Sequence, residues 1–118
     1  MNGDDEFGVE QTVYVVNQRT RFGFVGSTIR CWAKFRTSEG DPVDPDTVSF
    51  IYLKPQATMP TTLAYGTDDE VEKMGVGHYR VELSPASGET GRWVWRWQGT
   101  GDHGAVNEGD FVITPSAL

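Results

Sequence analysis

The sequence has one cysteine, Cys31, and no long apolar run. A lone cysteine excludes an internal disulfide and a cysteine-rich zinc site. No apolar stretch approaches the roughly 18 residues that cross a bilayer, so we expect no transmembrane helix. Residues 1–10 are acidic and lack an apolar core segment, so we expect no secretory signal. The fold must therefore depend on packing alone.

Basic residues are few: the chain has 10 Lys and Arg against 17 Asp and Glu, for a net charge of −7. Phosphate neutralisation supplies most non-specific affinity for nucleic acid, and basic residues likewise attract anionic lipid. We therefore expect neither nucleic acid nor a membrane among the partners. The length of 118 residues predicts one domain with a sizeable core.

Motifs that support catalysis are also missing. The chain has no G-x-S-x-G nucleophile elbow, no Walker A pattern and no dinucleotide-binding glycine pattern. The two histidines, His78 and His103, are 25 positions apart and form no metal-spaced pair. Cys31 falls on the face predicted to be core, where a thiol acts as a small hydrophobe. We expect a protein that is not an enzyme and uses no cofactor.

Two acidic clusters resemble metal sites only superficially. The first does not match the spacing of a calcium-binding EF-hand loop, and two prolines stiffen it. Aspartate is common in turns because its side chain bonds the nearby backbone. We interpret both clusters as turns, with calcium as the weaker alternative for the first. The clusters are Asp41, Asp44 and Asp46, and then Asp68, Asp69, Glu70 and Glu72.

Short runs of alternating apolar and polar residues, separated by turn residues, indicate an all-β protein. We predict an immunoglobulin-like antiparallel β-sandwich of about seven to nine strands over residues 13–118. Residues 1–12, acidic and with two glycines, are predicted to be a flexible N-terminal arm. Residues 13–16 are either the first strand or an arm that pairs with a partner. Gly109-Asp110 is a candidate β-bulge in the last strand. The predicted strands are residues 13–16, 22–25, 27–37, 47–53, 61–65, 71–74, 78–83, 92–98 and 105–114.

Alternation also predicts the core, because successive side chains of a strand point to opposite faces. Trp93, Trp95 and Trp97 share one face of their strand. Such a stripe is more often core than a platform for stacking sugars, since large aromatics dominate cores. The predicted core markers are Trp93, Trp95, Trp97, Tyr79, Phe35 and Phe111.

Trp32 points to the opposite face from this core, between Arg30, Lys34 and Arg36. Tryptophan and arginine are enriched at binding hot spots, so these four residues are a candidate partner-binding site. The equally weighted alternative is that another β-layer or the N-terminal arm covers Trp32.

Several spaced elements together resemble a group of small immunoglobulin-like proteins of tailed bacteriophages and prophages. They span residues 20–116. The resemblance implies a virion-associated β-sandwich in a phage setting, and it brings no catalytic residues. The elements are Gly40-Asp41-Pro42-Val43-Asp44-Pro45-Asp46-Thr47-Val48, Tyr65-Gly66-Thr67-Asp68, Gly77-His78-Tyr79, Gly91-Arg92-Trp93, Arg96-Trp97-Gln98-Gly99-Thr100-Gly101 and Glu108-Gly109-Asp110-Phe111.

On this basis we expect a structural protein of the phage particle, assembled in the bacterial cytoplasm and retained in the virion. The favoured role is a capsid decoration (cement) protein that binds the outside of the head. A head–tail connector or tail accessory protein fits almost as well. The expected partners are the major capsid protein or a neck or tail protein. A module that binds carbohydrate or a host surface is the remaining alternative.

Overall fold

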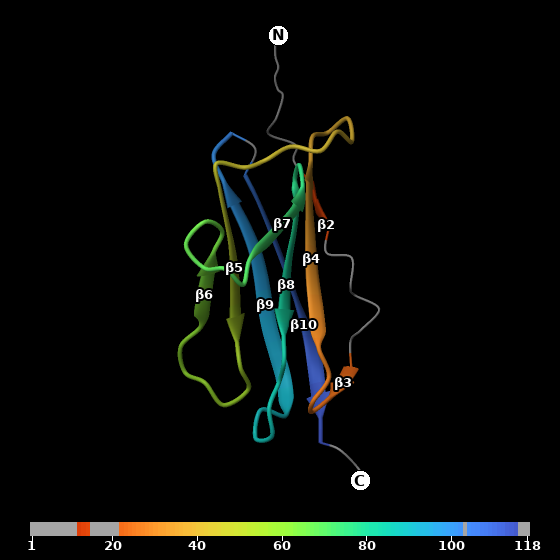
Figure 1. The fold of residues 1–118 in the computed structure, drawn as a ribbon, viewed down its shortest axis with the longest axis vertical. Helices are drawn as coiled ribbons and strands as arrows, with labels where there is room; N and C mark the ends of the chain where they lie inside the picture. The colour runs from red at the N-terminus through yellow and green to blue at the C-terminus, as the bar shows by residue number, and fades with distance from the viewer. Residues whose placement is uncertain (1–11, 15–21, 103, 116–118) are drawn as a thin grey trace.

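The chain forms two stacked β-sheets, whose strands overlap in the view of Figure 1. The computed structural model describes residues 12–14, 22–102 and 104–115. None of these residues belongs to a helix long and apolar enough to cross a membrane. The five-stranded sheet contains, in spatial order, β3 (Phe22–Phe24), β10 (Ala105–Thr114), β9 (Gly91–Thr100), β5 (Thr47–Leu53) and β6 (Thr61–Ala64). The four-stranded sheet contains β2 (Thr12–Tyr14), β4 (Ile29–Arg36), β8 (His78–Leu83) and β7 (Glu72–Gly75).

This strand order confirms the predicted all-β, immunoglobulin-like sandwich. Neighbouring strands run antiparallel, with one exception: β3 pairs with β10 in parallel. β2 and β3 lie in different sheets, and each is a short edge strand of three residues. A short edge strand presents few unpaired backbone groups to another chain.

The predicted boundary between arm and domain, between residues 12 and 13, falls within the first described segment, residues 12–14. Residues 1–11 of the predicted arm and Val15 and Val16 of the first predicted strand lie outside the described residues. Thr12, which the prediction placed in the arm, is the first residue of β2. β2 pairs with β4 of the same chain, from Thr12 opposite Arg36 to Tyr14 opposite Lys34.

The core lies between the sheets and is built from alternate residues of the long strands. All six predicted core markers are buried there. Trp97 has no exposed surface, and its ring centroid lies 4.8 Å from that of Phe50. Cys31 is a buried free thiol, and burial raises its pKa to about 12. A thiol with so high a pKa stays protonated at neutral pH and is a poor nucleophile.

Gly109 does not mark a bulge, contrary to the prediction. The register between β10 and β9 continues unbroken through Gly109 opposite Trp95. A Cβ atom at position 109 would overlap the indole of Trp95. The glycine is therefore needed for side-chain packing, and it lets a large ring lie flat across the neighbouring strand.

Asp44 joins the loop between β4 and β5 to the turn between β7 and β8, at the upper end of the molecule in Figure 1. Its Oδ1 accepts hydrogen bonds from the Gly77 amide (2.7 Å) and the Tyr79 hydroxyl (3.0 Å). Its Oδ2 accepts one from Lys73 Nζ at 2.8 Å. Burial opposes ionisation of Asp44, but these three hydrogen bonds outweigh it and hold its pKa below the usual value.

We predict that Asp44→Asn loses roughly 1.5–3 kcal/mol of unfolding free energy at neutral pH, the range for hydrogen bonds to a charged group. Because the folded-state pKa is lowered, the carboxylate stabilises the fold above the pKa of the unfolded chain. That stabilisation is lost as the pH falls through the folded-state pKa. Urea unfolding at neutral pH and at about pH 3 measures both effects. Asp41→Asn, an exposed charge in the same loop, is the matched control. An equal deficit at both pH values would contradict the prediction.

Candidate partner-binding face

The predicted binding residues Arg30, Trp32, Lys34 and Arg36 lie together on the outer face of β4. The residues between them are buried, so the alternation expected from the sequence is present. On β8, the neighbouring outward residues are Glu82 opposite Arg30, Arg80 opposite Trp32, and His78 opposite Lys34. We call the outward side chains of β4, β8 and β7 in this sheet the β4–β8 face. It consists of Arg30, Trp32, Lys34, Arg36, His78, Arg80, Glu82 and Glu72.

Trp32 is half-buried, because its neighbours on β8 partly cover it. Its ring centroid lies 5.1 Å from that of His78, with the planes tilted by 32°. The Arg80 guanidinium lies over the indole, with Cζ 5.4 Å from the ring centroid. Such a cation–π contact is worth about 0.5–1 kcal/mol at an exposed site. Trp32 is thus held in one position while part of its surface still faces outwards.

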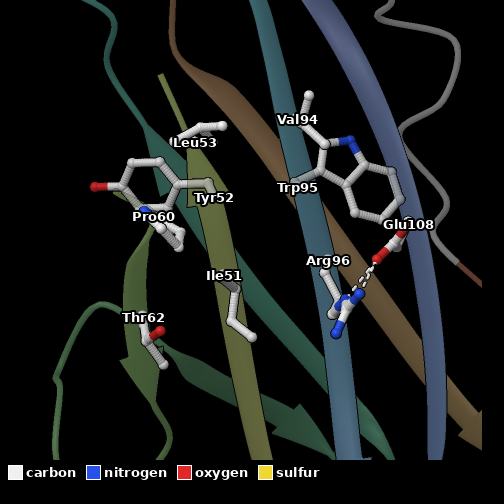
Figure 2. Close-up of a pocket in the computed structure, with 9 residues that line it drawn as sticks. All are labelled: Ile51, Tyr52, Leu53, Pro60, Thr62, Val94, Trp95, Arg96 and Glu108. Carbon is white, nitrogen blue, oxygen red and sulfur yellow. Dashed lines mark hydrogen bonds and ion pairs between the residues drawn. The ribbon is translucent and has the colours of Figure 1, made fainter. Parts of the chain in front are cut away.

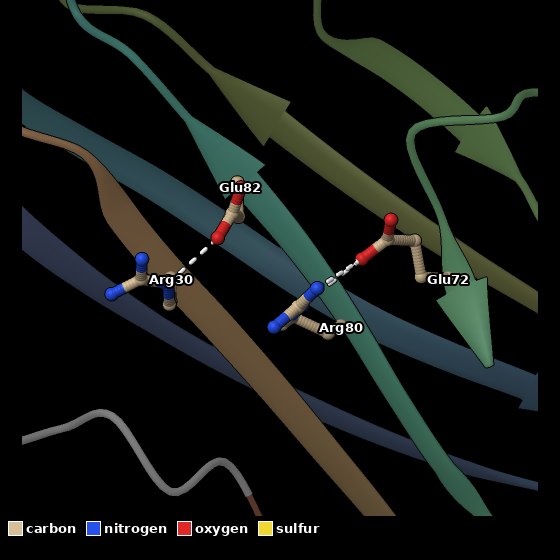
Figure 3. Close-up of polar contacts among 4 residues, drawn as sticks. All are labelled: Arg30, Glu72, Arg80 and Glu82. Atoms are coloured by element: carbon tan, nitrogen blue, oxygen red, sulfur yellow. Dashed lines mark hydrogen bonds and ion pairs between the residues drawn. The ribbon is translucent and has the colours of Figure 1, made fainter. Parts of the chain in front are cut away.

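Two ion pairs cross this face, as Figure 3 shows. Arg30 Nε lies 2.6 Å from Glu82 Oε2, joining β4 to β8. Arg80 Nε lies 3.0 Å from Glu72 Oε1, joining β8 to β7. Exposed pairs of this kind add little stability. Their effect here is to fix the side chains around Trp32 and to neutralise two of the cations.

The remaining cations of the face lack such partners. No described carboxylate forms an ion pair with Lys34 or Arg36. Arg36 Nη1 donates a 3.0 Å hydrogen bond to the carbonyl oxygen of Gly40, which orients its guanidinium. This end of the face is therefore positively charged on a protein whose net charge is −7.

The outer face of the five-stranded sheet carries a hollow of about 430 Å³, whose lining residues are drawn in Figure 2. Ile51 and Leu53 of β5 and Val94 of β9 supply apolar surface, with Pro60 at one side. The Arg96–Glu108 ion pair lies beside it. A signal for this surface is present in the sequence, because the strand 47–53 is apolar on both faces. That pattern also fits a central strand, which is why it does not by itself predict a hollow.

The other sequence candidates do not form a site. Trp93, Trp95 and Trp97 are at most 6% exposed, so they offer no platform for sugar stacking. The carboxylate of Asp44 accepts hydrogen bonds from three groups of the chain itself. Asp68 Oδ2 accepts a 2.8 Å hydrogen bond from the Ala64 amide. Within the described residues, no three His, Cys, Asp or Glu side chains are grouped to hold a metal ion. His103 lies outside the described residues.

No protein-family model and no curated protein matches this sequence. Solved structures do match the fold. The chain is similar to the Lin-41 filamin domain, with a TM-score of 0.62 and 11% identity over 86% of this chain and 91% of that one. It is also similar to part of an endo-β-1,4-mannanase from Thermotoga petrophila, with a TM-score of 0.61 and 12% identity. That match covers 91% of this chain and 20% of the mannanase chain.

At these identities the likeness concerns the fold alone. It agrees with the strand order in placing the chain among immunoglobulin-like sandwiches. This fold is consistent with a binding or structural module. The β4–β8 face is where the structure gathers the residues predicted for such a role.

Proposed function

We propose that this protein is a non-enzymatic structural component of a tailed-phage particle, and that it decorates the outside of the capsid head. The observation that carries the binding role is the β4–β8 face. It presents a fixed, half-buried tryptophan among cations, two of which have no ion-pair partner among the described carboxylates. Tryptophan and arginine are enriched among the few residues that carry most of the binding energy at protein interfaces.

The phage setting is supported by the resemblance of the spaced sequence elements. Several of their residues have structural roles in this chain. Asp44 joins its loop to Gly77 and Tyr79. Gly99 packs against Phe35 and Pro45, and Gly109 accommodates Trp95. A carbohydrate-binding role has weaker support, since the tryptophan stripe is inside the sandwich.

Quantitative mass spectrometry of purified particles, scaled to the major capsid protein, tests this function. A copy number comparable with that of the capsid subunits is expected for a decoration protein. A few copies per particle would move the protein to the neck or tail. Its complete absence from particles would overturn the structural role and make a glycan-binding screen the next experiment.

We predict that Trp32→Ala folds normally but binds particles at least tenfold more weakly, the loss expected when a central aromatic anchor is truncated. Binding of the purified variant to particles lacking the protein would be measured by co-sedimentation. Val106→Ala, an exposed apolar truncation on the other sheet, is the control. Unchanged binding of Trp32→Ala would exclude the β4–β8 face as the contact surface.

A further inference from the structure

A small hollow opens at the end of the β4–β8 face, next to the turn between β7 and β8. Its volume is about 220 Å³. Lys34 and Arg36 of β4 and His78 of β8 line it, together with the turn residues Gly75, Val76 and Gly77. Among the described residues, no carboxylate contributes to its lining, and Val76 is an exposed apolar side chain, 57% accessible.

The charges around this hollow are one-sided. Lys34 and Arg36 have no ion-pair partner among the described carboxylates, whereas Arg80, the next cation along the face, is neutralised by Glu72. Asp44, in the nearby loop, is directed to Gly77, Tyr79 and Lys73. An anion in the hollow would therefore meet cations whose charge nothing else in the described structure satisfies.

His78 lines the hollow, and histidine is the side chain type that changes its charge near neutral pH. Burial, followed by the charges of Lys34, Arg36 and Arg80, lowers the pKa of His78. Two carboxylates lie on the elements next to His78. Glu72 on β7 forms an ion pair with Arg80, and Asp44 in the loop forms one with Lys73. Nε2 of His78 is buried and has no hydrogen-bond partner within the described structure. A bound anion would favour the protonated ring.

We propose that this hollow binds the carboxylate side chain of an acidic segment on a protein partner. The proposal deepens the proposed function, because the segment would belong to the protein that contacts the β4–β8 face. A lysine and an arginine at the rim match a carboxylate in charge, and arginine can bind it with two hydrogen bonds. The adjacent indole of Trp32 and the Val76 side chain suit the apolar surface of a protein. The net charge of −7 repels an extended polyanion such as nucleic acid.

The test uses the full chain, labelled with ¹⁵N, and an acetylated, amidated tetraglutamate peptide as the probe. Amide shifts are followed during titration, and the ring protons of His78 report its pKa in the free and peptide-bound protein. We expect shifts confined to residues 34–36 and 75–78. We also expect the pKa of His78 to rise on binding, with affinity increasing several-fold from about pH 8 to about pH 5.5. Inorganic phosphate and a short single-stranded oligonucleotide are titrated in parallel.

Two variants separate the contributions. Lys34→Gln/Arg36→Gln is expected to weaken peptide binding at least about tenfold, the loss for removing charged hydrogen-bond donors. Arg92→Gln/Arg96→Gln removes the same charge from the opposite sheet and is expected to bind as the parent does. His78→Gln should still bind, without the pH dependence. A dispersed amide spectrum for each variant establishes that it is folded.

Several results would overturn the proposal. Amide shifts that are scattered over the protein surface during the peptide titration would do so. An equal loss of peptide affinity in both double variants would also do so. Stronger binding of phosphate or oligonucleotide than of the peptide would assign the hollow to another anion. These outcomes are independent of the particle measurement: absence of the protein from particles overturns the phage role but leaves a positive peptide titration standing.

Discussion

Replacing Trp97 with alanine is expected to lower the unfolding free energy by about 3–5 kcal/mol, the range for truncating a fully buried aromatic residue. The side chain has 0% exposure and packs against Phe50 in the centre of the sandwich. A 118-residue domain without a disulfide has only roughly 5–15 kcal/mol to lose. Urea unfolding followed by fluorescence of the remaining tryptophans measures the change.

Two further variants identify the cause. Trp97 Nε1 is buried without a hydrogen-bond partner in the described structure, so Trp97→Phe loses ring area but no hydrogen bond. We expect it to cost clearly less than alanine. Trp32→Ala removes the same ring from the outer face and should cost less than Trp97→Ala, since Trp32 is partly accessible whereas Trp97 has no exposed surface. Similar losses for Trp97→Ala and Trp32→Ala would mean that Trp97 is not a central core residue.

The alternation along each strand was enough to predict the core, because a period of two fixes which side chains face the other sheet. It placed Trp32, Lys34 and Arg36 outward, and also His78 and Arg80. It could not show that these two groups meet. That contact depends on the pairing of β4 with β8, which lie more than 40 residues apart, and turn residues do not specify such long-range pairing.

Other features depend on contacts that no local pattern reports. The parallel pairing of β3 with β10 joins the two ends of the domain. The prediction of a bulge at Gly109 uses only the sequence of its own strand. The reason for a glycine there lies on the neighbouring strand, because the Trp95 ring leaves no room for a side chain. Asp44 was interpreted as a turn residue; its hydrogen bonds to Gly77 and Tyr79 span 33 and 35 positions of sequence. In each case the residue type indicates a special local role, but the residue that it contacts lies too far away in the sequence to be predicted.

Gly77→Ala is expected to be the second severe substitution, costing roughly 2–5 kcal/mol from two separate causes. The backbone at Gly77 has φ +68°, a conformation that residues with a side chain rarely adopt. An added Cβ would also lie 2.5 Å from the carbonyl oxygen of Phe35 and 2.7 Å from that of Val43. These atoms belong to backbone, so the overlap is relieved only by moving the turn that donates a hydrogen bond to Asp44.

Gly88→Ala separates the two causes. Gly88 has φ +91° but nothing within 4 Å of its added Cβ, so its substitution reports backbone strain alone, at about 1–2 kcal/mol. The difference between the two variants then measures the steric overlap at Gly77. Because the hollow beside His78 includes this turn, displacing it should also shift the His78 ring resonances at temperatures where the variant remains folded. Equal costs at positions 77 and 88 would show that the turn can move freely, and a turn that moves freely could not hold His78 in position for an anionic partner.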